Sequence, residues 1–154
     1  ALAQSWNETL VFDIGVLVGH EMERFGVQIW LAPALNIHRS PLCGRNFEYY
    51  SEDPFLSGHI RSAIIKGVQK HSGCGTTIKY YACNNQETNR HTSNSVVSQR
   101  ALREIYLKPF EICVKEAQTK AIMSSYNLIN KEHSCNSKDI QTHILRDEWD
   151  LKDS

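Results

Sequence analysis

The sequence predicts an α/β fold with parallel strands, organised as part of a TIM-type (β/α)8 barrel with about three βα units. Three runs rich in β-branched, aromatic or apolar residues start near Val27, Thr76 and Ala121, and such residues favour strands. Segments of helical periodicity precede, separate and follow these runs, so the predicted order is α-β-α-β-α-β-α. This alternation favours a parallel sheet with right-handed crossovers.

The loops that follow the predicted strands are long and polar, whereas the connections that lead into the strands are short. This asymmetry is typical of a (β/α) barrel, whose active face lies at the carboxyl ends of its strands. Three units cannot close an eight-stranded barrel, and an isolated parallel sheet would leave both edges open. We therefore expect residues 1–154 to be part of a larger barrel domain that is truncated at both ends.

The first helix is predicted from about Trp6 to Arg24, with a stop at Gly26. Ser5 and Glu8 have the spacing of a capping box, which makes Ser5 the expected N-cap. The apolar residues expected on its buried face are Leu10, Ile14, Leu17 and Val18. A strand over residues 27–31 follows.

The second helix is predicted from Pro54 to about Lys70, because proline is accepted in a first helical turn. Ser51 and Asp53 are both candidates for its N-cap. The central strand comes next, over residues 76–81, and leads into a polar loop.

The third helix is predicted to start after Ser98, and Pro109 inside it should kink it. The residues expected on its inward face are Leu102, Ile105, Tyr106, Cys113 and Ala117. A strand over residues 121–125 and a helix over residues 138–149 complete the pattern.

The composition limits the partners of the chain. The formal net charge is zero, so there is no basic field to attract nucleic acid or an anionic membrane, and we expect neither partner. The five cysteines are scattered without a CxxC pair, so we predict no disulfide framework, no metal site and no cofactor. Scattered thiols and the lack of a visible signal peptide favour a cytoplasmic location.

The stretch from Ile78 to Arg90 is the most informative part of the chain. It begins as a strand and then turns abruptly to amides and charged residues. Amide groups together with Arg and Lys can hold neutral hydroxyls from several directions, which suits a sugar. From composition alone, a solvated loop after a buried strand explains the same residues.

Six stretches carry long motifs: LAPALNIHRSP (31–41), GRNFEYYSEDP (44–54), IKYYACNNQETNR (78–90), and residues 98–110, 121–130 and 145–149. In their order and spacing these stretches resemble glycoside hydrolase family 3, of the β-glucosidase type. The resemblance covers almost the whole chain. The β-xylosidase branch of the family differs around Gly44 and Gln86, so it ranks lower.

The resemblance implies a retaining exo-β-glycosidase that hydrolyses terminal β-D-glucosyl residues of oligosaccharides or glucosides, with two catalytic carboxylates about 5–5.5 Å apart. It places the nucleophile on a strand after Ser154, a sugar-binding Asp on a strand before Ala1, and the acid/base in another domain. The chain would then carry no catalytic residue. Its partners would be the substrate, the remaining barrel and the C-terminal domain of the parent chain.

The resemblance also implies a set of substrate-binding residues: Arg45, Lys79, Tyr80, Arg90 and Tyr126. The three cations would donate hydrogen bonds to sugar hydroxyls in the first subsite, and Tyr126 would lie close to the nucleophile. Three of these residues also have a structural interpretation. Arg45 could pair with Glu48 or Asp53, Lys79 with Glu87, and Tyr126 could simply pack beside its strand.

The chain departs from the family pattern at three positions. Tyr80 stands where the family has His, and Lys131 and Asp150 stand where it usually has Gly. These departures favour an alternative, a truncated or decayed non-catalytic copy with at most weak sugar binding. A third hypothesis is an unrelated barrel that holds a phosphate with Lys79 and Arg90, although no glycine-rich phosphate loop is present.

Overall fold

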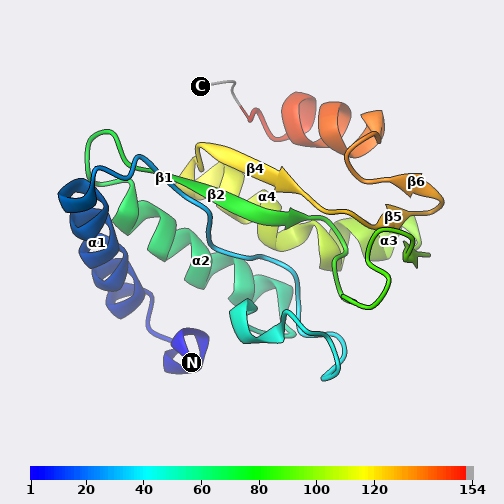
Figure 1. Cartoon of the computed structure of the whole chain (residues 1–154), viewed down its shortest axis with the longest axis horizontal. Coiled ribbons are helices and arrows are strands. Elements are labelled where there is room, and N and C mark those ends of the chain that lie inside the picture. The colour runs from blue at the N-terminus through cyan, green and yellow to red at the C-terminus, as the bar shows by residue number, and fades with distance from the viewer. Residues whose placement is uncertain (152–154) are drawn as a thin grey trace.

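The computed structural model describes residues 1–151 and contains a parallel sheet of three strands (Figure 1). These strands are β1 (Ile29–Trp30), β2 (Gly75–Tyr81) and β4 (Ala121–Ser124), in the order β1-β2-β4 across the sheet. Both strand pairs are parallel. The predicted α/β class with about three βα units is therefore confirmed, and the arrangement is consistent with part of a TIM-type barrel.

The first helix, α1 (Glu8–Phe25), begins two residues later than the capping box predicted. Asn7 is its N-cap, because the Asn7 side-chain oxygen accepts the backbone N–H three residues further on at 3.0 Å. Ser5 instead ends a short 3₁₀ turn, η1 (Leu2–Ser5), with Trp6 in the left-handed region after it. The prediction of Ser5 as the cap is wrong because Trp6 separates this turn from the helix.

Helix α1 packs against α2 (Pro54–Val68) through small residues rather than through its leucines. Gly15 approaches Gly67 so closely that a Cβ on either glycine would meet the backbone of the facing helix. Leu10 and Leu17, which periodicity assigns to the buried face, are exposed. The buried residues of α1 are Val11, Gly15, Gly19 and Met22. Close approach of the two backbones therefore decides which face of α1 is buried.

Asp53 caps α2, since its carboxylate accepts the backbone N–H groups of Phe55 and Leu56 at 2.7 and 2.9 Å. Pro54 occupies the first turn, as predicted. Helices α1 and α2 lie side by side along one face of the sheet, with α4 next to α2 (Figure 1).

The third predicted helix is divided into three segments: α3 (Gln99–Ala101), a wide π-helical turn η3 (Leu102–Tyr106) and α4 (Lys108–Ala117). Ser98 caps the first segment, as predicted. Pro109 lies in the first turn of α4 rather than inside a continuous helix. The wide turn is closed by Leu107 N–H donating to the Leu102 carbonyl at 2.8 Å. Its extra residue rotates Ile105 outward, so the predicted inward position of Ile105 is wrong.

A second, smaller sheet joins the loops that follow β2 and β4. It consists of β3 (Asn94–Ser95), β5 (Leu128–Ile129) and β6 (Glu132–His133), in the order β3-β5-β6. This sheet was not predicted from the sequence. The turn between β5 and β6 places Lys131 at φ 77°, and Asp150 after the last helix has φ 58°. These are the positions where the sequence resemblance implies Gly, and a Cβ is unfavourable at such positive φ angles.

The last helix is η4 (Asp139–Glu148), a wide helix that closely follows the predicted one. It contributes to the core beneath β2, where the Tyr81 ring lies 5.0 Å from Phe110 and 6.1 Å from Trp149 between ring centres. None of the helices within residues 1–151 combines the length and apolar character needed to cross a bilayer.

The outer strands β1 and β4 each have an open edge within residues 1–151. Apolar side chains lie exposed at and after β1, with Ile29 46% and Leu31 56% accessible. We therefore expect the purified 154-residue chain to be marginally stable, to self-associate and to melt without a sharp transition. Light scattering measures the self-association, and calorimetry measures the stability and the sharpness of the melt. A monodisperse monomer with a cooperative melt would contradict this prediction.

Candidate functional site

The three loops at the carboxyl ends of β1, β2 and β4 carry the predicted binding residues to one side of the molecule. Arg45 directly precedes a short 3₁₀ turn, η2 (Asn46–Glu48), in the loop after β1. Lys79 and Tyr80 belong to the last part of β2, Arg90 to the loop after it, and Tyr126 to the loop after β4. Parallel strands end at the same edge of a sheet, so these loops converge.

Glu48 brings three of the predicted residues together. One carboxylate oxygen lies 3.1 Å from Lys79 Nζ. The other accepts hydrogen bonds from Arg45 Nη1 at 3.1 Å and from the Tyr80 hydroxyl at 3.0 Å. Burial alone would raise the pKa of Glu48, but the hydrogen bonds from these three side chains outweigh burial and hold it below its usual range. The expected pairing of Lys79 with Glu87 is therefore wrong.

Glu87 is instead the link between the two arginines. Its Oε2 lies 3.2 Å from Arg45 Nε and 3.0 Å from Arg90 Nη1. Asn84 Nδ2 donates to the other oxygen at 3.1 Å. Burial would raise the pKa of Glu87, but the bonds from Asn84 and Arg45 lower it. Glu48 and Glu87 are thus central residues that the predicted set lacked, although each lies three positions from an arginine in the sequence.

Arg45 lies between these two carboxylates and is the most constrained cation of the cluster. Burial alone would lower the pKa of its guanidinium, but the hydrogen bonds to Glu48 and Glu87 raise it above the usual value. Arg45 Nη1 also donates to the Tyr80 hydroxyl. The guanidinium is therefore fixed in orientation by contacts in three directions.

Tyr80 is buried inside the cluster, with only 8% of its surface accessible. The centre of its ring lies 4.8 Å from Arg45 Cζ and 5.0 Å from Lys79 Nζ, which are cation–π distances. The ring packs in a small apolar cluster with Ala34, Cys43, Tyr49 and Met123. Both the ring and the hydroxyl of Tyr80 are therefore held in place.

Tyr126 is 55% exposed and does not pack as an ordinary strand residue. Arg90 Cζ lies 4.8 Å from the centre of its ring, and the His91 ring centre lies 4.6 Å away. The structure therefore joins Tyr126 to the charged cluster through Arg90, at the open side of the loops.

Two buried side chains, Asn36 and Tyr49, hold the loops in register beneath the cluster. Asn36 accepts the backbone N–H of Asn84 at 3.0 Å and donates to the Tyr80 carbonyl at 2.9 Å. Tyr49 donates its hydroxyl to the Asn84 carbonyl at 2.7 Å. Because buried polar groups that are fully bonded specify a single arrangement, these contacts give the cluster a rigid base.

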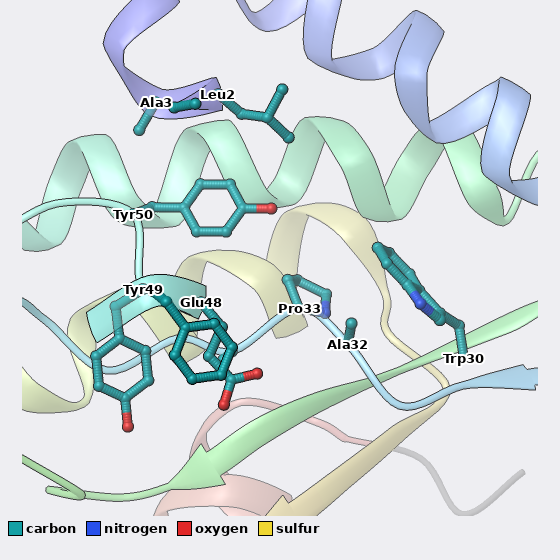
Figure 2. A pocket seen from close by; sticks show the side chains of 11 residues that line it. Leu2, Ala3, Trp30, Ala32, Pro33, Glu48, Tyr49 and Tyr50 are labelled. Atoms are coloured by element: carbon teal, nitrogen blue, oxygen red, sulfur yellow. The ribbon is translucent and has the colours of Figure 1, made fainter. Parts of the chain in front are cut away.

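Two open hollows flank the cluster. One, of about 260 Å³, lies between the N-terminal turn, the end of β1 and residues 47–50. Figure 2 shows the Glu48 carboxylate directed towards the sheet there, while the Tyr50 ring lies beside the N-terminal turn. The other, of about 890 Å³, is lined by residues 39–40, 42–44, 85–88 and 93–96, with Glu87 in its wall. Residues 1–151 thus build the floor of a site rather than an enclosed cavity.

The cluster alternates three cations with two carboxylates. A sugar hydroxyl can accept a hydrogen bond from a cation and donate one to a carboxylate, so the arrangement suits a neutral, polyhydroxylated ligand. Neither Glu48 nor Glu87 has the raised pKa that a general acid needs. In the part of the chain that the structure describes, no group of three or more His, Cys, Asp or Glu side chains could hold a metal ion.

Known proteins are similar to this chain in both sequence and fold. Residues 1–152 match the N-terminal domain of glycosyl hydrolase family 3. Beta-glucosidase A of Butyrivibrio fibrisolvens is 52% identical over 148 residues, covering 96% of this chain and 18% of that protein. An exo-alpha-(1->6)-L-arabinopyranosidase of Bifidobacterium longum is 48% identical over 148 residues, with 96% and 19% covered.

A solved structure of beta-glucosidase 3B from Thermotoga neapolitana in complex with alpha-D-glucose superposes with a TM-score of 0.93 at 51% identity. The match covers 96% of this chain and 21% of that one. The chain therefore spans about a fifth of the length of these relatives. By sequence and by fold, the chain belongs to glycosyl hydrolase family 3, within its N-terminal domain.

Proposed function

We propose that this chain is part of a retaining exo-β-glycosidase that removes terminal β-D-glucosyl residues from oligosaccharides or glucosides. In this proposal residues 1–154 are a part of the family's N-terminal barrel domain, truncated at both ends. The longer protein that contains them is called the parent below. The observation that carries the proposal is the cluster of Arg45, Lys79 and Arg90 interleaved with Glu48 and Glu87 at the carboxyl ends of the strands.

The cluster would form part of the first sugar subsite. Arg45, Lys79 and Arg90 would donate to sugar hydroxyls, while Glu48 and Glu87 orient the cations and accept hydroxyl protons. A phosphate is a poorer ligand, because Glu48 and Glu87 already offset two of the three positive charges and leave little net charge to attract an anion. The neutral hydroxyls of a sugar need no net positive charge.

The catalytic carboxylates of this proposal lie outside residues 1–154. The nucleophile attacks the anomeric carbon as the acid protonates the departing glycosidic oxygen, and water then hydrolyses the glycosyl-enzyme. The role of this chain is to hold the sugar in position beside them. The cations of the cluster would also keep a nearby nucleophile ionised, because an opposite charge favours the ionised carboxylate.

Specific features favour a second candidate, a truncated or decayed copy without catalysis. Lys131 and Asp150 adopt left-handed backbone conformations that glycine adopts without strain. Tyr80 fills the position where the family pattern has His. In this case the parent would bind sugar weakly and hydrolyse nothing.

We expect the full-length parent to hydrolyse 4-nitrophenyl β-D-glucopyranoside and the 154-residue chain alone to show no activity above background. The reason is that the chain holds part of the binding cluster without a catalytic pair. Release of 4-nitrophenol measures both proteins.

The controls for this experiment are the Glu48→Gln, Glu52→Gln and Glu87→Gln variants of the isolated chain. Activity of that chain, abolished by one of them, would place catalysis within it and contradict the proposal. An inactive full-length parent that still binds glucose would support the decayed copy.

A further inference from the structure

The position of the Tyr80 hydroxyl bears on which sugar the cluster accepts. Arg45 Nη1 donates to the phenolic oxygen, and the phenolic O–H donates to Glu48 at 3.0 Å. One cationic donor and one carboxylate acceptor therefore meet at a single oxygen. This is the pair of partners with which a protein holds a sugar hydroxyl, which can accept and donate at the same time.

The phenol cannot easily leave this position. Tyr80 is 8% exposed, and its ring is packed among Ala34, Cys43, Tyr49 and Met123. Its backbone carbonyl accepts a hydrogen bond from the buried Asn36 side chain at 2.9 Å. Displacing the hydroxyl would break two hydrogen bonds to charged groups and disturb a packed apolar cluster.

We infer that the Tyr80 hydroxyl takes the place of one substrate hydroxyl, so that the site prefers a β-glycoside that is deoxygenated at the ring position facing Tyr80. This inference rests on the proposed function, because it assumes that the cluster is a sugar subsite. If a sugar has a hydroxyl at that position, its potential donor Arg45 and acceptor Glu48 are already bonded to the phenol. A sugar with hydrogen there leaves both bonds to the phenol intact and presents an apolar C–H to the ring edge.

The remaining polar groups of the cluster stay available to the other hydroxyls. Lys79 Nζ carries three N–H donors, of which Glu48 takes one at 3.1 Å. The Lys79 and Arg90 side chains are 15% and 33% exposed, so both are accessible from the open side. The substrate class is therefore a sugar that keeps several hydroxyls and is deoxygenated at one position.

The test compares the full-length parent with its Tyr80→Phe variant. The substrates are 4-nitrophenyl β-D-glucopyranoside and its 2-, 3-, 4- and 6-deoxy analogues. Phe keeps the ring and removes the hydroxyl, which frees Arg45 and Glu48 for a substrate hydroxyl. For one deoxy analogue, the ratio of its kcat/KM to that of the glucoside should be about tenfold lower in the variant than in the unmodified parent. Tenfold is the usual contribution of one hydrogen bond to a charged group. Comparing variants cancels the intrinsic reactivity of each analogue.

Tyr106→Phe is the matched control. It removes the hydroxyl of a partly buried tyrosine on η3, outside the cluster. The relative kcat/KM values of the five substrates should not change in this variant. If Tyr80→Phe and Tyr106→Phe alter every ratio equally, or if Tyr80→Phe alters none, the inference is wrong.

A binding measurement distinguishes failure of this inference from failure of the proposed function. Ligand-detected NMR competition gives the relative affinities of the parent for glucose and for 2-, 3-, 4- and 6-deoxyglucose without turnover. Preferred binding of one deoxyglucose without hydrolysis of any glycoside would support the inference and overturn the proposed function. Hydrolysis of glucosides without a preference for any deoxy sugar in either assay would support the proposed function and overturn the inference. Absence of both binding and hydrolysis would overturn both.

Discussion

Arg61→Met should stabilise the parent against unfolding by about 3 kcal/mol. Arg61 lies in α2 and is fully buried. Its Nε and Nη1 have no hydrogen-bond partner among the described residues, and Nη2 reaches only the Asn36 carbonyl at 3.4 Å. Stacking of Arg61 Cζ at 4.4 Å from the centre of the Tyr50 ring offsets part of the cost. A buried cation with so few partners is costly, because its charge has lost its water.

The size of this cost follows from the titration of the guanidinium. Burial lowers the pKa of Arg61 to about 10, against a smaller opposing effect of Tyr50. A shift of that size corresponds to about 3 kcal/mol of lost stability while the group stays charged. Because the pKa is lower in the folded state than in the unfolded state, the cost is fully present below pH 10 and shrinks as the pH rises through 10. The advantage of Arg61→Met should shrink over the same interval.

Urea unfolding of the two proteins measures the difference, with Arg100→Met as the matched control. Arg100 of α3 is 84% exposed and pairs with Glu104 of η3 at the surface. Such pairs contribute little, so this control should change the stability by less than about 0.5 kcal/mol. A loss of stability in Arg61→Met would show that the guanidinium has an acceptor outside residues 1–151.

Glu48→Gln in the parent should lower kcat/KM for aryl β-glucosides about a hundredfold. The Glu48 carboxylate fixes the head groups of Lys79, Arg45 and Tyr80. Glutamine keeps the size of the side chain but removes its charge and turns an acceptor into a donor that opposes Lys79. The head groups would then lose their common anchor, and misplacement by about 1 Å can cost on the order of a hundredfold.

Glu104→Gln removes one carboxylate from the surface and is the matched control for Glu48→Gln. It should leave kcat/KM unchanged, because Glu104 is 60% exposed and lies on η3, outside the cluster. Near-UV circular dichroism should be compared so that a loss of folding is not read as a loss of function. A change of less than about threefold in a folded Glu48→Gln variant would mean that Glu48 does not position the binding cations.

The parallel sheet and the alternation of strands and helices along the chain could be predicted from the sequence because they rest on local signals. The strand runs are rich in β-branched and aromatic residues, and the intervening helices have caps and glycine stops that the structure confirms at Asp53, Ser98 and Gly26. The small sheet β3-β5-β6 could not be predicted. Its strands have two residues each and no alternation, and they pair only because the loops that carry them meet in space.

The gathering of the predicted binding residues followed from the convergence of the loops, but their pairing did not. Lys79 and Glu87 are near neighbours in sequence, yet the Glu87 carboxylate bonds to Arg45 and Arg90. Lys79 bonds to Glu48, more than thirty residues earlier. Sequence distance says little about which carboxylate a cation reaches when two loops interleave. The buried face of α1 was not predictable from periodicity either, because its glycines pack on α2 and Leu17 is left exposed.

Each cation of the cluster is already paired with a carboxylate before any sugar arrives. Arg45, Lys79 and Arg90 each bond to Glu48 or Glu87. A hydroxyl entering this network exchanges one hydrogen bond for another, so the gain in affinity is small even when the geometry is good. Under the proposed function, a free monosaccharide released by hydrolysis would bind weakly and depart quickly. The same network would therefore limit product inhibition while still aligning the substrate.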